Sequence, residues 1–105
     1  MAWVSLFLAG LCEIGWPVGL KLGWSDEGVR PGWLVFAAVA IVVSGALLMW
    51  AQRTIPMGTA YAIWTGIGAV GAFTVGIVAF GDTVSTIRIV SIGLIVAGIV
   101  GLKLA

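Results

Sequence analysis

The sequence predicts an all-α membrane protein with four transmembrane helices in a single domain, residues 1–105. Two observations lead to this prediction. Charged residues make up only 9% of the chain, against roughly 25% in an ordinary soluble domain, and the mean hydropathy is +1.24. The few charges also leave long uncharged stretches between them. Because a transmembrane helix needs about 20 mostly apolar residues, the chain has room for four.

The uncharged stretches place the helices. No charge falls between Arg30 and Arg53, between Arg53 and Asp82, or between Arg88 and Lys103. Together with the apolar N-terminal segment, these gaps predict helices at roughly 3–22, 32–52, 57–80 and 87–104. Short loops that hold the remaining charges, prolines or glycines join the helices.

Composition argues against several classes of function. The chain has one cysteine, Cys12, and no histidine, so an internal disulfide is impossible and a thiolate metal cluster is disfavoured. A formal net charge of +1 offers no basic face for nucleic acid. With no nucleophile–base pair visible, we expect neither an enzyme nor a cofactor. No charged segment precedes the first apolar stretch, so we expect a retained helix rather than a cleaved signal.

The first helix carries an acid near its middle. Glu13 lies about ten residues into the helix, near 15 Å deep at 1.5 Å per residue, which is about the midplane of a hydrocarbon core roughly 30 Å thick. No basic residue lies in the middle of any span. An unpaired acid at this depth is expensive and by default marks an ion or proton site. The alternative is a polar residue that is satisfied within a helix interface.

Two of the six tryptophans, Trp16 and Trp64, lie away from the span ends. Four of the six tryptophans fall near span ends, where an aromatic belt is expected: Trp3, Trp24, Trp33 and Trp50. Trp16 follows Glu13 by three residues and shares its helix face, and Tyr61 and Trp64 repeat this spacing. Such residues are most often packing, but aromatic rings around a carboxylate suit an organic cation. Ser44 could donate a hydrogen bond to the carboxylate, although a lone membrane serine more often bonds its own backbone.

Glycine and proline interrupt two helices. The segment GIGAVG, Gly66 to Gly71, matches the dinucleotide-binding pattern, but that pattern has to follow a strand and open a helix. Because it lies inside an apolar span, we reject a dinucleotide site. We expect three glycines here to bend the third helix or to pack it closely: Gly66, Gly68 and Gly71. Pro17 removes the hydrogen bond that its amide would give to the carbonyl of Glu13, which predicts a looser or bent first helix.

The fourth helix and the charge distribution bear on assembly. Gly93, Ala97 and Gly101 form a ridge of small residues at i, i+4 and i+8, which predicts a close helix–helix contact. We assign it to a dimer interface, although a contact within one subunit would give the same pattern. The alternative is chance, because glycine is common in this chain. Four short helices enclose little by themselves, so we expect an oligomer.

Lysine and arginine are almost evenly divided between the two sides. With four spans, one side holds Arg53 and Lys103, and the other holds Lys21, Arg30 and Arg88. The bias in these residues sets membrane orientation, and here it nearly vanishes. Either the count is uninformative, or the protein inserts in both orientations. Such dual topology would allow an antiparallel homodimer.

Two segments resemble a known family. AGLCEIGW around Glu13, with Lys21 at the end of the first helix, and IPMGTAYAIWTGIGAVG from Ile55 are similar to those of the small multidrug resistance transporters. The resemblance covers nearly the whole chain, and the longer string is specific. It implies an antiparallel homodimer in a bacterial inner membrane, which exchanges protons for a cation by alternating access.

The details resemble the guanidinium exporter subtype of that family. This subtype favours threonine at Thr59 and Thr65 and tryptophan at Trp16, and it tends to carry a lysine where this chain has Lys103. Pro17 departs from the pattern, in which a small residue is usual. The resemblance implies a substrate and proton site of five residues: Glu13, Trp16, Ser44, Tyr61 and Trp64.

We therefore expect a proton-coupled antiporter that exports guanidinium, with the small cation, protons, the lipid bilayer and a second copy of the chain as its partners. Two alternatives stay open. A multidrug exporter of quaternary ammonium and other hydrophobic cations would need a wider apolar site. A structural or regulatory membrane subunit without transport would have no use for an isolated acid at the midplane.

Overall fold

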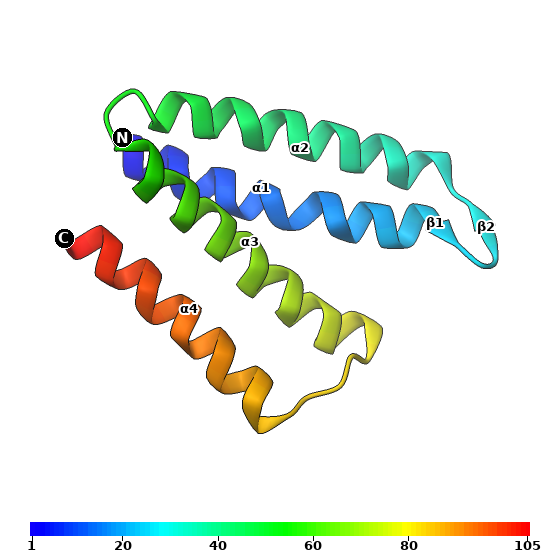
Figure 1. Cartoon of the computed structure of the whole chain (residues 1–105). Coiled ribbons are helices and arrows are strands. Elements are labelled where there is room, and N and C mark those ends of the chain that lie inside the picture. The colour runs from blue at the N-terminus through cyan, green and yellow to red at the C-terminus, as the bar shows by residue number, and fades with distance from the viewer.

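A computed structural model describes all 105 residues, which form four helices and one small hairpin (Figure 1). The helices are α1 (Ala2–Gly23), α2 (Pro31–Ala51), α3 (Met57–Phe80) and α4 (Thr86–Leu104). All four are long and apolar enough to cross a membrane. The predicted all-α, four-span fold class is confirmed, and each helix begins and ends within one residue of its expected range.

The helices form a thin, open arrangement rather than a closed bundle. Their lateral order is α2, α1, α3, α4, since α1 packs against α2 and α3, and α4 packs mainly against α3 (Figure 1). The Cα positions extend over 46 × 34 × 16 Å. The subunit is therefore much thinner in one direction than in the other two.

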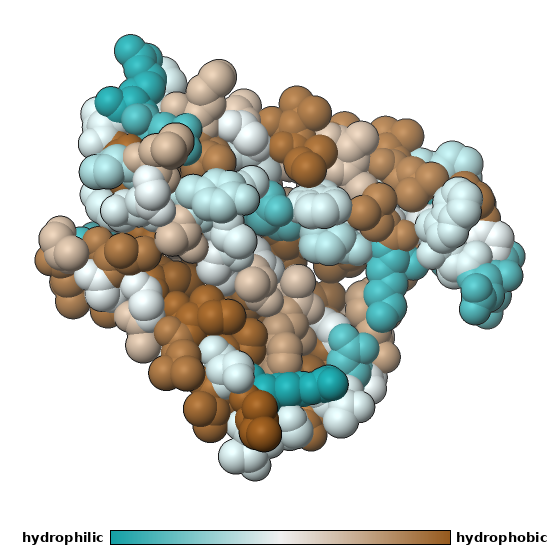
Figure 2. All heavy atoms as spheres, in the orientation of Figure 1, coloured by the Kyte–Doolittle hydropathy of each residue, from teal (hydrophilic) through white to brown (hydrophobic).

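The buried core is small. Its main cluster joins the start of α1 to the end of α2 and the start of α3, through Leu6, Ala51, Ile55, Ala60 and Ile63. The accessible surface is 6643 Å², against about 5,500 Å² expected of a soluble monomer of 10.8 kDa. No residue of α4 is buried, and apolar atoms dominate the visible surface over α4 (Figure 2). This excess apolar surface is available to lipid or to another protein chain.

Local signals set the helix ends. Pro31 opens α2 at its first turn, where its missing N–H costs nothing. Gly81 closes α3 with a left-handed φ of 67°, the conformation that glycine favours after a helix. Ser85 precedes α4 and accepts a hydrogen bond from the backbone N–H of Arg88 at 3.3 Å, as an N-cap does.

The first loop is more ordered than the sequence indicates. It forms an antiparallel hairpin of β1 (Trp24–Ser25) and β2 (Gly28–Val29). Gly28 has a φ of 128°, which L side chains rarely adopt, and a glycine accommodates this turn without strain. Strands of two residues have no periodicity, so an apolar–polar pattern could not predict them.

The expected bend of α1 at Pro17 is not seen. The helix is continuous from Ala2 to Gly23 with Pro17 inside it, and Figure 1 shows no sharp kink. Gly15 and Gly19 let α2 approach closely, because an added Cβ would lie 3.3 Å from Ala40 and 2.9 Å from Ala37. Packing against α2 and α3 thus holds α1 straight although one backbone hydrogen bond is missing.

Candidate functional site

Glu13 lies halfway along α1 and faces α3. The contact depends on a glycine, because a Cβ added at Gly68 would lie 2.6 Å from Glu13 Cγ. One turn further along α3, Gly71 faces Ile14 of α1, and a Cβ added at Gly71 would clash with the Ile14 side chain. Gly66 meets α4 in the same way, since an added Cβ would lie 2.8 Å from Ile99. In this structure the three glycines therefore allow close packing, and α3 runs through them as a continuous helix.

Trp16 contacts the acid directly. Its indole Nε1–H donates a hydrogen bond to Glu13 Oε1. Because the two residues are three apart on one helix, this bond needs no other element to form. The side chain of Trp16 thereby orients one carboxylate oxygen from within α1.

Ser44 links three helices beside the acid. The side chain is fully buried, and its Oγ donates to the carbonyl of Ala9 at 2.7 Å and accepts from Trp64 Nε1–H at 2.7 Å. Glu13 Oε2 is 3.4 Å from the same Oγ. A hydroxyl has one proton to donate, so the nearer acceptor, the carbonyl of Ala9, takes the stronger hydrogen bond. The expected donation to the carboxylate is the longer arm of a shared hydrogen bond.

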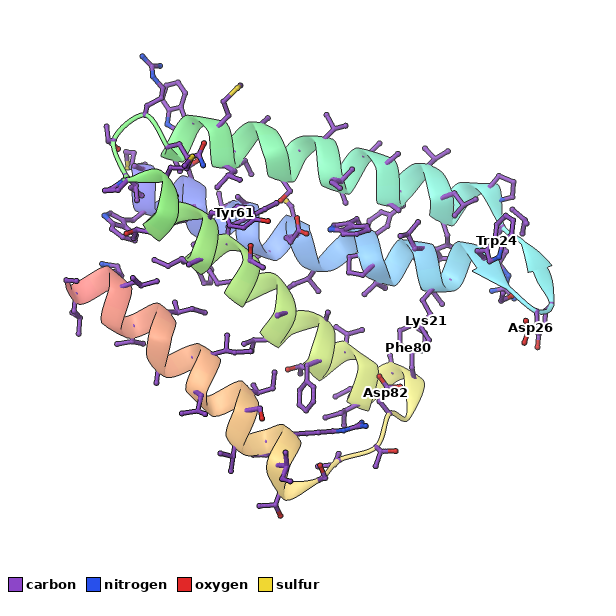
Figure 3. The ribbon with its side chains drawn as sticks, viewed as in Figure 1. Lys21, Trp24, Asp26, Tyr61, Phe80 and Asp82 are labelled. Atoms are coloured by element: carbon purple, nitrogen blue, oxygen red, sulfur yellow. The ribbon has the colours of Figure 1, made fainter.

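The aromatic residues of α3 line the side of this cluster. The rings of Tyr61 and Trp64 lie 5.4 Å apart between centroids, with 50° between their planes. Trp64 is bonded to Ser44, whereas Tyr61 is 56% exposed and lies near the point where α3 crosses α1 (Figure 3). The site is therefore open on one side of the single subunit.

No cation neutralises Glu13. The two salt bridges of the structure join Lys21 to Asp82 at 4.0 Å and Arg30 to Glu27 at 3.9 Å, both outside the middle of the spans. A carboxylate offers about four lone-pair positions, of which Trp16 and Ser44 use two at most. The remaining positions can accept a proton or the N–H groups of a small cation.

Comparison with known proteins identifies the family. Residues 1–95 match the family described as Small Multidrug Resistance protein. The chain belongs to the small multidrug resistance family. Its relatives include proteins named guanidinium exporter from Salmonella typhimurium strain LT2, 52% identical, Citrobacter freundii, 51% identical, and Escherichia coli strain K12, 50% identical. Each comparison covers all of this chain and 98% of the relative.

Membership of the small multidrug resistance family confirms the resemblance noted from the sequence, and with four membrane-spanning helices the chain is a multi-pass membrane protein. The roles of the individual site residues stay predictions. So does the dimer interface on α4. There Gly93 and Gly101 have nothing within 4 Å of an added Cβ, and Ala97 is exposed.

Proposed function

We propose that this protein exports guanidinium in exchange for protons, with the carboxylate of Glu13 as the common binding group for both. The observation that carries the proposal is an intramembrane acid whose partners are hydrogen-bond donors and not cations. The relatives support the choice of substrate, because proteins named guanidinium exporter match the chain over its whole length at about half identity.

The geometry suits a planar cation. Guanidinium is permanently charged, and two of its N–H groups can meet a carboxylate side by side, as those of arginine do. Trp16 and Ser44 hold the carboxylate without filling its accepting positions. A proton and guanidinium compete for the same oxygens, so that binding of one displaces the other. Competition of this kind couples the two fluxes when the site is open to one side at a time.

The working unit that we propose is an antiparallel homodimer in a bacterial inner membrane. The subunit alone leaves its candidate site open on the side where Tyr61 is exposed. A second copy would cover this open side and bring a second Glu13 to the site. The nearly even division of lysine and arginine favours insertion in both orientations, and the relatives named above are bacterial.

The alternative is export of quaternary ammonium and other hydrophobic cations. Such ions have no N–H groups and would be held by the charge of the carboxylate and by the aromatic rings of Trp16, Tyr61 and Trp64. The accepting positions that Trp16 and Ser44 leave free on Glu13 favour an ion with N–H groups instead. A subunit without transport is a weaker alternative still, since it would keep an unpaired acid at the midplane at a cost and without a use.

Flux measurements in proteoliposomes with an imposed pH gradient test the proposal. We expect proton-driven movement of guanidinium, and little or none of tetramethylammonium, because hydrogen-bonding sites strongly reject analogues that lack the matching groups. The Glu13→Gln variant keeps the size of the side chain but loses its charge and its titration, so it should fold and carry out no coupled transport. Equal flux of both ions would favour the multidrug alternative, and coupled flux through Glu13→Gln would refute the role of the acid.

A further inference from the structure

The basic residues at the two ends of the helices have different partners. At the end that holds the β1–β2 hairpin and the α3–α4 loop, each base is neutralised or hydrogen-bonded. The contacts are Lys21 to Asp82 at 4.0 Å, Arg30 to Glu27 at 3.9 Å, and Arg88 to the carbonyl of Thr83 at 3.0 Å. Figure 3 shows Lys21, Phe80 and Asp82 close together where the end of α1 faces the end of α3.

The opposite end carries positive charge without an acidic side chain. Its bases are Arg53, after α2, and Lys103, near the end of α4, while Asp26, Glu27 and Asp82 all lie at the hairpin end. Each base lies over a tryptophan ring: Arg53 over Trp50 at 5.1 Å and Lys103 over Trp3 at 4.8 Å. An aromatic ring attracts a cation but leaves its N–H groups free for an anion.

Arg53 and the two tryptophans line a hollow at this end of the subunit. The hollow has a volume of about 790 Å³, and its walls include Trp3, Trp50, Arg53 and Thr54. Trp3 is the second residue of α1 and Trp50 the last but one of α2, so both lie at the level where lipid headgroups meet the hydrocarbon. The hollow thus opens at headgroup level and presents a guanidinium and two indole rings.

An apolar cavity continues from the same tryptophan toward the membrane interior. It has a volume of about 110 Å³ and is lined by Trp3, Leu6, Phe7, Ile63, Ile67 and Ile99, with Lys103 at its edge. Leu6 and Phe7 lie about one turn deeper in the membrane than Trp3. The hollow and the apolar cavity are adjacent because both have Trp3 in their walls, and the cavity reaches about one turn deeper into the membrane. The headgroup and the acyl chain of a phospholipid follow in the same order.

We propose that this end of the protein binds an anionic phospholipid, with the phosphate at Arg53 and the upper part of one acyl chain in the apolar cavity. Arg53 is the main recognition group because its planar fork of donors matches a phosphate. A free anion would use Arg53 but not the apolar cavity. A zwitterionic lipid would bring its own cation close to Arg53.

Native mass spectrometry of the purified full-length protein in detergent tests this proposal. Phosphatidylglycerol and phosphatidylcholine with identical acyl chains are added separately, and their dissociation constants are compared. We expect phosphatidylglycerol to bind at least about tenfold more tightly, and Arg53→Gln to weaken its binding by about tenfold, as the loss of a charged hydrogen bond implies.

Arg30→Gln is the matched control, because it changes the net charge equally at the end where the arginine is already paired with Glu27. It should leave the affinity for phosphatidylglycerol within about twofold. Equal losses in the two variants would mean bulk attraction and would overturn the proposal. So would equal binding of the two lipids, or displacement of phosphatidylglycerol by inorganic phosphate at the same concentration. Circular dichroism of both variants verifies that they remain folded.

Discussion

At the scale of single residues, the structure separates contacts that lie within one helix from contacts that need tertiary packing. The bond from Trp16 to Glu13 spans three residues of α1, so the sequence spacing was sufficient to predict that the two lie together. The bonds of Ser44 to Ala9 and Trp64 depend on how α2 and α3 dock against α1. No spacing in the sequence encodes that docking, so the sequence did not predict that Ser44 bonds a backbone carbonyl of another helix.

Replacing Ser44 by alanine should weaken guanidinium binding through the loss of these contacts. The change leaves the N–H of Trp64 without an acceptor and removes the donor near Glu13 Oε2. An unsatisfied buried group costs about 1–3 kcal/mol, so we expect a rise of roughly tenfold in the half-saturating guanidinium concentration. Substrate-dependent quenching of tryptophan fluorescence and liposome flux would measure it.

Ser91→Ala is the matched control for that experiment. The hydroxyl of Ser91 bonds the carbonyl of Ile87 in its own helix at 2.7 Å and is exposed. Its loss should leave binding and flux unchanged. If the two serine variants behaved alike, the network around Ser44 would have no special part in transport.

At the scale of elements, the charge gaps predicted the helices, but the sequence left the role of the α3 glycines open between bending and packing. Gly66, Gly68 and Gly71 each receive a side chain of a neighbouring helix, and for Gly68 that side chain is Glu13 itself. The rotation of α3 about its axis decides which neighbouring side chain packs against each glycine. A single sequence does not specify that rotation.

Gly68→Ala should therefore disturb the acid from the opposite helix. The added methyl group would lie 2.6 Å from Glu13 Cγ, and overpacking of this kind typically costs about 1–3 kcal/mol. We expect lower thermal stability in detergent and a loss of most coupled guanidinium flux. Gly45→Ala, next to Ser44 but with nothing within 4 Å of its added Cβ, should be nearly neutral in both measurements. Normal flux in Gly68→Ala would mean that the acid does not depend on its contact with α3.

The ridge on α4 gives a second test at this scale. Gly93 and Gly98 both have open space around an added Cβ, but they lie on different faces of the helix, and only Gly93 belongs to the proposed interface. Gly93→Leu should weaken dimerisation by about 1–3 kcal/mol through overpacking, whereas Gly98→Leu should not. Crosslinking yield in membranes would measure the difference. Equal yields in the two variants would move the interface away from this ridge.

At the scale of the whole molecule, the number of spans and the thinness of the single subunit were predictable from the sequence, whereas the lateral order of the helices was not. Hydropathy and charge specify which segments cross the membrane. The order α2, α1, α3, α4 arises from which glycines meet which side chains, as between Gly19 and Ala37 or Gly23 and Leu34. The same order leaves α4 at one edge with no buried residue, which is why assembly with a second copy belongs to the proposed function.

The orientation of the chain in the membrane is testable at the same scale. Arg53 and Lys103 on one side face Lys21, Arg30 and Arg88 on the other, and acidic residues contribute little to this bias. We expect a tag placed after Ala105 to be found on both sides of the membrane, as accessibility to an impermeant reagent would show.

Two or three lysines added at the same place should force one orientation and lower guanidinium export, because only parallel pairs could then form. Export should return when this variant is expressed together with one biased the opposite way. A wild-type tag accessible from one side only would rule out dual topology and with it the antiparallel homodimer.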